Sequence, residues 1–164
     1  MPNSPRPLVV LIGFLDTKLT EHALVHRRLT DLGCDVKVID ISLRGSKADP
    51  ACLPISVGPE SVHDMATRSG RLGTGVGKEM PSRADELDVM IAGATEAVLS
   101  YQDDDQLCGV MGFGGSTTTA AVASIMRSLN IGLPKLVVST MASGDVSVYL
   151  GDSDITIMPS IGSC

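Results

Sequence analysis

The chain has 164 residues and a formal net charge of −6, from 13 basic and 19 acidic side chains. This length suits one domain that buries roughly 70% of its unfolded surface, and the acidic balance argues against a nucleic-acid partner, which would require a basic face. Aromatic residues make up 2% of the chain and hydrophobic residues 43%, so the core must be mostly aliphatic, which is typical of buried parallel strands covered by helices.

The first 41 residues predict a strand, a helix and a second strand. Leu8–Ile12 is a continuous apolar run of the kind found in a strand that is buried on both faces. Asp16 and Thr17 offer an N-cap for a helix of about 15 residues that ends at Gly33. Residues 35–41 predict the second strand. Because the connections are short, we expect a right-handed parallel crossover.

The middle of the chain is rich in glycine and proline and predicts a long loop over residues 42–80, interrupted by one short helix at Pro59–Thr67. Within this loop, residues 73–79 resemble a fragment of a phosphate-binding P-loop. Leu72 stands where the motif requires its first glycine, and Glu79 stands where it requires serine or threonine. We therefore interpret this fragment as an ordinary loop.

The second half of the chain repeats the strand–helix pattern. A long helix is predicted from Pro81 and Ser82 to about Tyr101, and an alanine-rich helix over Ala120–Leu129. Strands are predicted over Leu107–Phe113, Pro134–Val138 and Ile155–Met158. The expected fold is therefore α/β: one domain over residues 1–164, with an open parallel sheet of Rossmann-like strand–helix–strand units and helices on both faces.

Three of the predicted strands run into polar or glycine-rich loops, at Gly13–Lys18, Gly112–Thr119 and Ser139–Asp145. The carboxyl ends of parallel strands share one edge of the sheet, where ligands bind. A helix that begins at such an edge presents unpaired backbone N–H groups and a partial positive charge. These loops therefore predict an anion site, and the phosphates of a nucleotide are the ligand that fits best.

The candidate phosphate-binding side chains and backbone groups come from these loops and from two nearby cations. They are Lys18, Arg83, Gly114, Gly115, Ser116, Thr117, Ser139, Thr140, Ser143 and Gly144. Each has a simpler interpretation: the glycines allow tight strand–helix packing, the hydroxyls and Asp145 form a hydrogen-bonded turn, and the two cations are solvated.

Metal, membrane and secretion signals are weak. His22 and His26 have the spacing of metal ligands on one helix face, but no third ligand is evident, so we predict no metal site. The four cysteines fit no zinc pattern, and the N-terminal residues do not have the shape of a signal peptide. Leu8–Ile12 is too short to span a bilayer. We therefore expect a soluble, cytoplasmic protein that has no membrane partner.

Several motifs in the chain resemble those of one known family. Ile12-Gly13 with Asp16–Lys18 is similar to its N-terminal motif, and Gly112–Ser116 is similar to its Gly-x-Gly-Gly-Ser loop. Asn130–Lys135 followed by Val138–Asp145 is the most specific match. Over nearly its whole length, the chain resembles the family of the Tm-type tobamovirus-resistance protein, which is an uncharacterised protein family.

The resemblance implies an ATP-binding module with an α/β fold that forms dimers. ATP, alone or with Mg²⁺, would be the ligand, facing Lys18, Arg83, Gly114–Thr117 and Ser139–Gly144. In the plant member, the module binds and inhibits a viral replication protein. Chains of the family continue into a second α/β subdomain. We therefore expect this chain to be the first half of a larger module, with a second copy or the missing subdomain as its partner.

Two other functions remain open. The same loops would serve an enzyme that acts on a phosphorylated or carbonyl substrate, with Asp16 or Asp145 as acid or base. The domain would also serve as a scaffold for protein interactions. The sequence identifies no catalytic residues, so whether the chain is an enzyme stays undecided.

Overall fold

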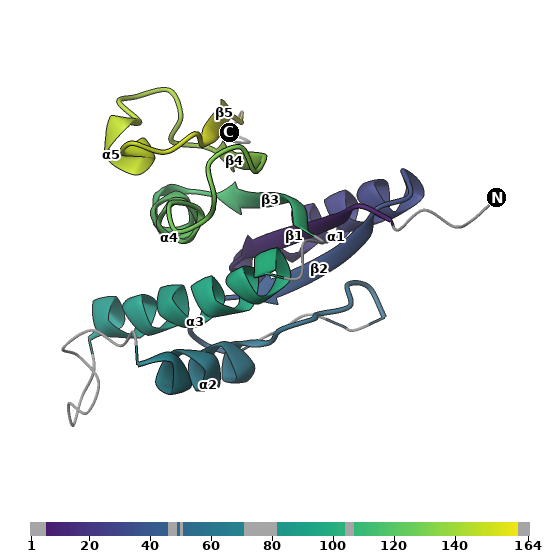
Figure 1. Cartoon of the computed structure of the whole chain (residues 1–164), viewed down its shortest axis with the longest axis horizontal. Coiled ribbons are helices and arrows are strands. Elements are labelled where there is room, and N and C mark those ends of the chain that lie inside the picture. The colour runs from purple at the N-terminus through teal and green to yellow at the C-terminus, as the bar shows by residue number, and fades with distance from the viewer. Residues whose placement is uncertain (1–5, 46–48, 50, 71–81, 104–106, 161–164) are drawn as a thin grey trace.

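The structure is a computed structural model that describes residues 6–45, 49, 51–70, 82–103 and 107–160 (Figure 1). The strands are β1 (Leu8–Gly13), β2 (Asp35–Asp40), β3 (Leu107–Gly114), β4 (Lys135–Ser139) and β5 (Thr156–Pro159). The helices are α1 (Leu15–Asp31), α2 (Pro59–Ser69), α3 (Arg83–Asp103), α4 (Ser116–Met126) and α5 (Ser147–Leu150). None of the described helices is long and apolar enough to cross a membrane.

The five strands form one parallel sheet in the order β2-β1-β3-β4-β5, which confirms the predicted α/β fold. The chain moves from β1 outward to β2, and later from β3 outward through β4 to β5. The direction of winding therefore reverses between β1 and β3. In open α/β sheets, the connections diverge at such a reversal and leave a crevice at the carboxyl ends of the strands.

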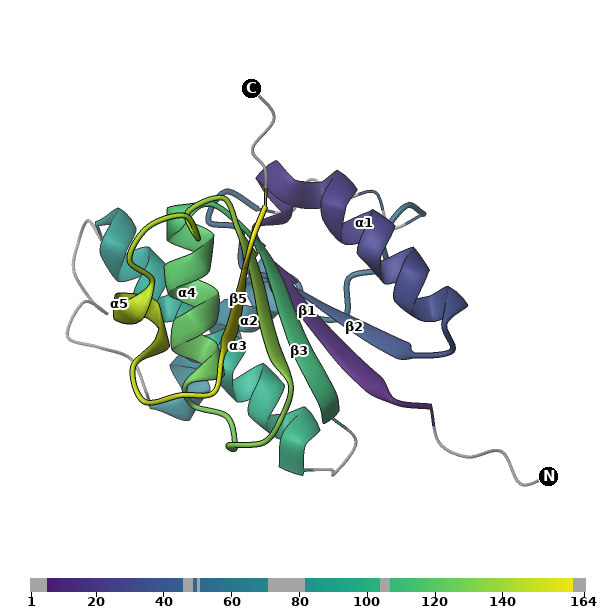
Figure 2. The same cartoon turned by 90° about the horizontal axis from the view of Figure 1, so that it is seen from above.

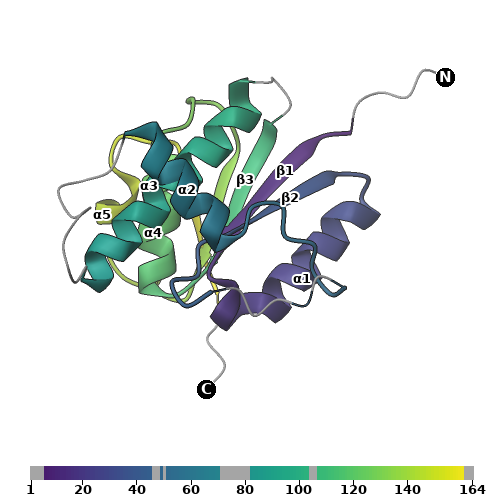
Figure 3. The same ribbon diagram turned by 90° about the horizontal axis from the view of Figure 1, so that it is seen from below.

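Helices cover both faces of the sheet, as predicted. Alternate residues of β1 point to opposite faces: Val10 and Ile12 pack in the core shared with α2, α3 and α4, whereas Leu11 packs with Leu15 of α1. Figure 3 shows α1 on one side of the strands and α2, α3 and α4 on the opposite side. In Figure 2, α1 lies at the end of the sheet formed by β1 and β2.

The start of α1 differs from the sequence-based prediction. The helix begins at Leu15 rather than after Asp16, and its N-cap, Phe14, offers no side-chain hydrogen bond. Two side chains from the end of β2 take that role. The Leu15 N–H donates to Asp40 Oδ1 at 3.3 Å, and the Asp16 N–H donates to Ser42 Oγ at 3.1 Å. The prediction of a local cap was therefore wrong, because the cap comes from a distant part of the chain.

The connection between β3 and α4 is shorter than predicted. We expected the helix to start at Ala120, but β3 extends to Gly114 and α4 begins at Ser116, so that Gly115 alone joins them. Thr119 stabilises this early start, because its hydroxyl donates to the Gly115 carbonyl at 2.8 Å. The short helix α5 was not predicted, and β5 lies one residue later than expected.

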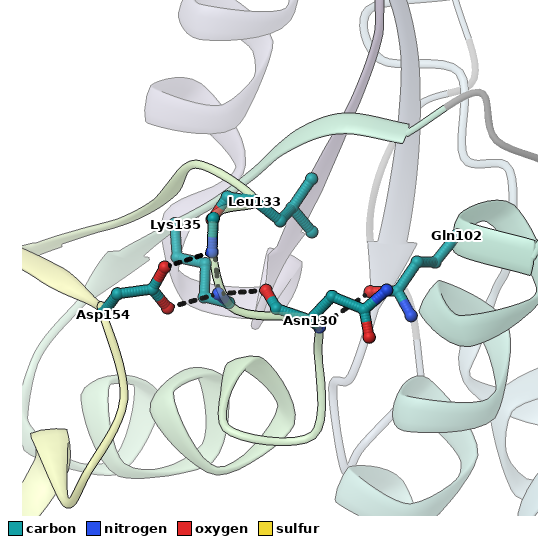
Figure 4. Close-up of polar contacts among 6 residues, drawn as sticks. Gln102, Asn130, Leu133, Lys135 and Asp154 are labelled. Atoms are coloured by element: carbon teal, nitrogen blue, oxygen red, sulfur yellow. Dashed lines mark hydrogen bonds and ion pairs between the residues drawn. The ribbon is translucent and has the colours of Figure 1, made fainter.

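A buried lysine anchors the amino end of β4. The side chain of Lys135 has no exposed area, and its ammonium donates to Asp154 Oδ1 at 2.5 Å, to the Asn130 carbonyl at 2.7 Å and to the Leu133 carbonyl at 3.3 Å (Figure 4). The Gly132 N–H donates to the other carboxylate oxygen of Asp154 at 2.7 Å. All three ammonium hydrogens therefore have acceptors, as a buried charge requires.

This network links four parts of the fold. The Asn130 N–H also donates to Gln102 Oε1 at 3.0 Å. The network therefore joins the end of α3, the loop before β4, β4 itself and the residues before β5. Hydrogen bonds from Lys135 and Gly132 hold the pKa of Asp154 below its usual value. Because the folded state favours the ionised carboxyl, this contribution to stability is present at neutral pH and is lost as the pH falls through that lowered pKa.

Replacing Lys135 with methionine should destabilise the fold, because two carbonyls and a carboxylate lose their donor. We expect the free energy of unfolding, measured by urea denaturation at neutral pH, to fall by about 2 kcal/mol, as for other hydrogen bonds to charged groups. The difference should shrink at acidic pH, as the pH falls toward the lowered pKa of Asp154. The matched control is Lys37→Met, at an exposed position of β2, which should not change the midpoint. Equal midpoints for Lys135→Met and wild type would contradict the anchoring role.

Candidate functional site

A pocket of about 500 Å³ opens where the winding of the sheet reverses. Its walls come from the ends of β1 and β2 and from the first turns of α3 and α4. The lining residues are Phe14, Asp16, Thr17, Leu43, Arg44, Arg83, Glu86, Gly115, Ser116, Thr117 and Thr118. Both its size and its place at the switch point are typical of ligand sites in α/β proteins.

Three helices begin at this pocket, and two of them have their first N–H groups capped by side chains. In α1, the caps are Asp40 and Ser42. In α3, Ser82 and Asp85 cap each other: the Ser82 N–H donates to Asp85 Oδ2 at 2.9 Å, and the Asp85 N–H donates to Ser82 Oγ at 3.1 Å. Neither helix start therefore has its first N–H groups fully free for an external anion.

The start of α4 is different. Its N-cap is Gly115, and within the described part of the chain no side chain caps the helix. The first residues of α4, Ser116 and Thr117, are exposed and line the pocket, so their backbone N–H groups lie at the pocket wall together with their hydroxyls. Such N–H groups, combined with the positive end of the helix dipole, form an anion-binding surface.

The two glycines before α4 have different reasons to be glycine. A Cβ on Gly114 would lie 2.3 Å from Thr118 Oγ1, so this position needs glycine for strand–helix packing. A Cβ on Gly115 would lie 3.7 Å from its nearest neighbour, Thr140 Oγ1, which is ordinary van der Waals contact. Packing therefore explains Gly114 but not Gly115, and the space above the start of α4 stays open.

Charged side chains of both signs line the pocket. Arg44 and Arg83 contribute guanidinium groups, and Asp16 and Glu86 contribute carboxylates. Guanidinium groups match the geometry of phosphate oxygens, and carboxylates accept hydrogen bonds from hydroxyls or amines. The pocket is therefore suited to a ligand that carries both an anionic group and hydrogen-bond donors.

Of the predicted site residues, the structure brings Arg83, Gly115, Ser116 and Thr117 together around this pocket, with Gly114 directly before them. Lys18 is not among the lining residues. Its ammonium lies 2.7 Å from Glu21 Oε1, one turn further along α1.

The predicted loop after β4 lies next to the start of α4, because β3 and β4 pair in parallel and Gly114 is opposite Ser139. Ser139 is buried, with its hydroxyl 2.7 Å from that of Thr119. The Thr140 N–H donates to the Gly114 carbonyl at 3.1 Å. Ser143 and Gly144 follow in an exposed turn, and none of these four residues at and after the end of β4 lines the pocket.

The remaining sequence signals have structural explanations or lie outside the described residues. Asp145 Oδ1 accepts the Ser147 N–H at 2.9 Å, and hydrogen bonds from Ser147 hold the pKa of Asp145 below its usual value, as in a polar turn. Among the described residues, no three histidine, cysteine or acidic side chains lie close enough to hold a metal. The fragment resembling a P-loop, residues 73–79, lies outside the described part of the chain.

Sequence reasoning missed several residues of the pocket. Arg44 follows the end of β2, and the rule that ligands bind at the carboxyl ends of parallel strands applies to β2 as well as to the strands that we considered. Glu86 lies three residues after Arg83 and therefore on the same face of α3. Phe14 and Leu43 carried no polar signal, although apolar side chains make up much of most ligand pockets.

Comparisons with known proteins identify the family of the chain. Residues 7–163 match the model of the N-terminal domain of the uncharacterised protein family UPF0261. A UPF0261 protein of Clostridium tetani is 29% identical over 158 residues, which cover 93% of this chain and 36% of that protein. The ToMV resistance protein Tm-1 of Solanum lycopersicum is 32% identical over 177 residues, which cover 97% of this chain and 22% of that protein. This chain therefore spans well under half the length of these relatives.

Alanine substitutions should separate the two glycines at the start of α4. Gly114→Ala places its Cβ against the stiff β-branched side chain of Thr118, so we expect a loss of about 1–3 kcal/mol in the free energy of unfolding. Gly115→Ala meets no such obstacle and should stay within about 0.5 kcal/mol of wild type. Urea denaturation measures both, and equal losses for the two variants would contradict the distinction.

Proposed function

The chain belongs to the uncharacterised protein family UPF0261, whose N-terminal domain it matches over residues 7–163, and from this premise we propose that it is a nucleotide-binding module whose pocket holds the phosphates of ATP. One observation carries the proposal: among the described residues, no side chain caps the start of α4 at the pocket, and packing does not require a glycine at Gly115. A phosphate would supply acceptors to the N–H groups of Ser116 and Thr117, for which the described residues offer no side-chain acceptor.

The energetics favour an anion at this position. Hydrogen bonds to a charged group contribute about 1.5–3 kcal/mol each, and a negative charge at a helix N-terminus gains roughly 0.3–1 kcal/mol more. The hydroxyls of Ser116 and Thr117 offer further donors, and Arg83 adds a guanidinium in the same pocket. These groups together support binding of a phosphate chain better than binding of a single weak anion.

The rest of the pocket suits the remainder of a nucleotide. Phe14 and Leu43 provide apolar surface for a base, and the Asp16 and Glu86 carboxylates can accept hydrogen bonds from ribose hydroxyls. The volume of about 500 Å³ fits a small organic ligand. We propose ATP as that ligand, bound alone or with Mg²⁺.

We also propose that the other predicted binding residues contribute to ligand binding. Ser139 and Thr140 adjoin the start of α4, and Ser143 and Gly144 follow them along the same rim. Lys18 lies one residue beyond Thr17, and to reach a phosphate its ammonium would exchange Glu21 for the ligand. This exchange is inexpensive, because an ion pair between partly exposed groups contributes little to stability.

One alternative is an enzyme that acts on a phosphorylated or carbonyl substrate. The observation that favours it is the carboxylate of Asp16, which lines the same pocket as the start of α4 and would serve as an acid or base there. Release of phosphate from ATP by the purified chain, abolished in Asp16→Asn, would support an enzyme. Binding of ATP without turnover would support a binding module, and no ATP binding would leave an interaction scaffold.

We propose that the protein resides in the cytoplasm. Cys34 and Cys52 are free thiols, and reduced cysteines are the norm in that compartment.

We propose that the chain pairs with a second copy through one face of its sheet. On the α1 side, α1 contacts β1, β2 and β3, whereas Leu136, Val138 and the residues that pair with them on β5 carry no described helix. Met158 on this face is 47% exposed. An apolar sheet surface of this kind usually binds another protein surface.

The open start of α4 makes a specific prediction for affinity. Gly115→Val fills the space over the helix N-terminus with a side chain that the backbone tolerates, so we expect ATP to bind at least about tenfold more weakly, the equivalent of one lost charged hydrogen bond. Arg83→Ala should weaken binding by a similar factor. Calorimetric titration of ATP, with and without Mg²⁺, measures both effects.

The matched control for this titration is Ala120→Val, which introduces the same side chain at an exposed position of α4, away from the pocket. It should bind ATP as wild type does. The melting temperatures of all three variants should stay close to that of wild type, which separates lost binding from lost folding. Wild-type affinity in Gly115→Val, or no ATP binding by the wild-type chain at millimolar concentrations, would refute the proposed site.

The bare sheet face predicts concentration-dependent self-association. Met158→Lys puts a charge on this face, and we expect it to convert a dimer into a monomer in light scattering. Val148→Lys is the control, because Val148 is an exposed apolar residue on α5, outside this face. A wild-type chain that stays monomeric at all concentrations would show that no second copy binds there and would leave the second subdomain as the partner.

A further inference from the structure

A buried histidine lies beneath the pocket wall. His22, on α1, has no exposed area, and both of its ring nitrogens face backbone carbonyl oxygens. Nδ1 lies 2.8 Å from the Lys18 oxygen, and Nε2 lies 3.3 Å from the Ile12 oxygen. Its ring thus connects the end of β1 to the fourth residue of α1, and the proposed nucleotide contacts do not include it.

The two carbonyls bound by the ring stand at either end of a short piece of the pocket wall, the β1–α1 segment (residues 13–17). Phe14, Asp16 and Thr17 of this segment line the pocket. At Lys18 the backbone leaves helical geometry, with φ −127° and ψ 29°, so the first turn of α1 is separated from the rest of the helix by a kink. The imidazole bridges both ends of this separated turn.

We propose that His22 is a positioning residue of the pocket, whose imidazole holds the β1–α1 segment in place and whose protonation makes anion binding in the pocket depend on pH. The inference rests on the proposed function, because it concerns the regulation of the same site. His22 acts through Asp16, Thr17 and Phe14 and does not touch the ligand.

The surroundings of the ring fix its position. A Cβ on Gly13 would lie 2.4 Å from His22 Nε2, so the end of β1 accepts the ring only because residue 13 is glycine. From β3, Phe113 packs edge-on to the ring, with the centroids 5.0 Å apart and the planes at 84°. The imidazole therefore cannot swing away from the two carbonyls without displacing the core or the strand end.

The number of protons on the ring determines how many of the two carbonyls it can bind, and this number depends on pH. A neutral imidazole has one N–H and can donate to only one of the two carbonyls, whereas the imidazolium donates to both. The charged groups near the ring are Glu21 on α1 and Asp40 on β2, and both favour the protonated form; the Lys18 ammonium is paired with Glu21. β1 contributes only the Ile12 carbonyl, and β3 contributes the uncharged ring of Phe113.

Burial lowers the pKa of His22 below its usual value, and the hydrogen bonds to Lys18 and Ile12 oppose this effect without cancelling it. The ring is therefore neutral at neutral pH and takes up its second proton below about pH 6.5. Protonation then secures both ends of the β1–α1 segment and places a positive charge under an anion site. We expect anion affinity to rise as the pH falls through this range.

Sulfate is the probe for this test, because it stays fully ionised where nucleotide phosphates themselves titrate. We expect calorimetry to show severalfold tighter sulfate binding by the wild-type chain at an acidic pH, below the lowered pKa of His22, than at about pH 8. His22→Asn keeps a donor in the place of Nδ1 but cannot be protonated, so its affinity at the higher pH should stay within about twofold of wild type and should not rise on acidification. His22→Leu removes both bonds and should bind sulfate more weakly at every pH.

His26 supplies the matched control. It lies one turn further along α1, is less buried, and among the described contacts its ring has no hydrogen-bond partner. His26→Asn should keep the wild-type affinity and the wild-type pH profile. Circular dichroism of each variant at both pH values checks that the fold is intact, and rescue of binding by asparagine but not by leucine separates positioning from core packing.

A second measurement uses the wild-type chain alone. In NMR spectra recorded without ligand, the amide signals of Asp16 and Thr17 should shift with the same midpoint as the ring protons of His22. If these amides shift with His22 but no sulfate or ATP binds, the proposed function fails and the positioning of the wall stands. If the anion binds with a pH profile that His22→Asn leaves unchanged, or if the amides do not follow His22, the inference is overturned and the proposed function stands.

Discussion

Unpaired N–H groups at the starts of helices determine how this edge of the sheet is built. Each of α1, α3 and α4 begins near the point where the winding of the sheet reverses, and each therefore brings donors that need acceptors. The acceptors for α1 come from side chains at the end of β2, and the acceptor for α3 comes from a side chain in its own first turn. The donors of α4 are left facing a pocket. This difference between three otherwise similar helix starts favours a phosphate ligand at α4.

The fold could largely be predicted from the sequence, because its strongest signals are local. The apolar run of β1 and the glycine that ends α1 identify a strand and a helix without any knowledge of their neighbours. The start of α1 could not be predicted in this way, since its acceptors lie 25 and 26 residues further along the chain. The start of α4 was missed for a related reason: threonine has a low intrinsic helix propensity, and only its bond to Gly115 reveals that it lies inside the helix.

In the candidate site as well, some residues could be predicted from local sequence signals and others were missed. Gly115, Ser116 and Thr117 could be found because they follow a strand directly. Arg44 and Glu86 were missed although Arg44 follows a parallel strand and Glu86 lies one turn after Arg83, because neither belongs to a glycine- or hydroxyl-rich loop. The first part of the motif that carried the most specific family resemblance, Asn130–Lys135, forms the network at the amino end of β4 instead. These residues hold the fold together at the end of the sheet away from the pocket, whereas the second part, Val138–Asp145, adjoins the start of α4.

The single residue between β3 and α4 determines which side of the pocket can move. A strand and a helix joined by Gly115 alone, and tied to β4 through Thr119 and Ser139, form one stiff unit with no slack in the connection. A ligand would find its anion-binding groups already in place and would lose little entropy in ordering them. Any adjustment to ligands of different size must then come from the opposite wall, at Phe14 and Leu43. Specificity for the phosphate and tolerance for the rest of the molecule would thus reside on separate parts of the same small cleft.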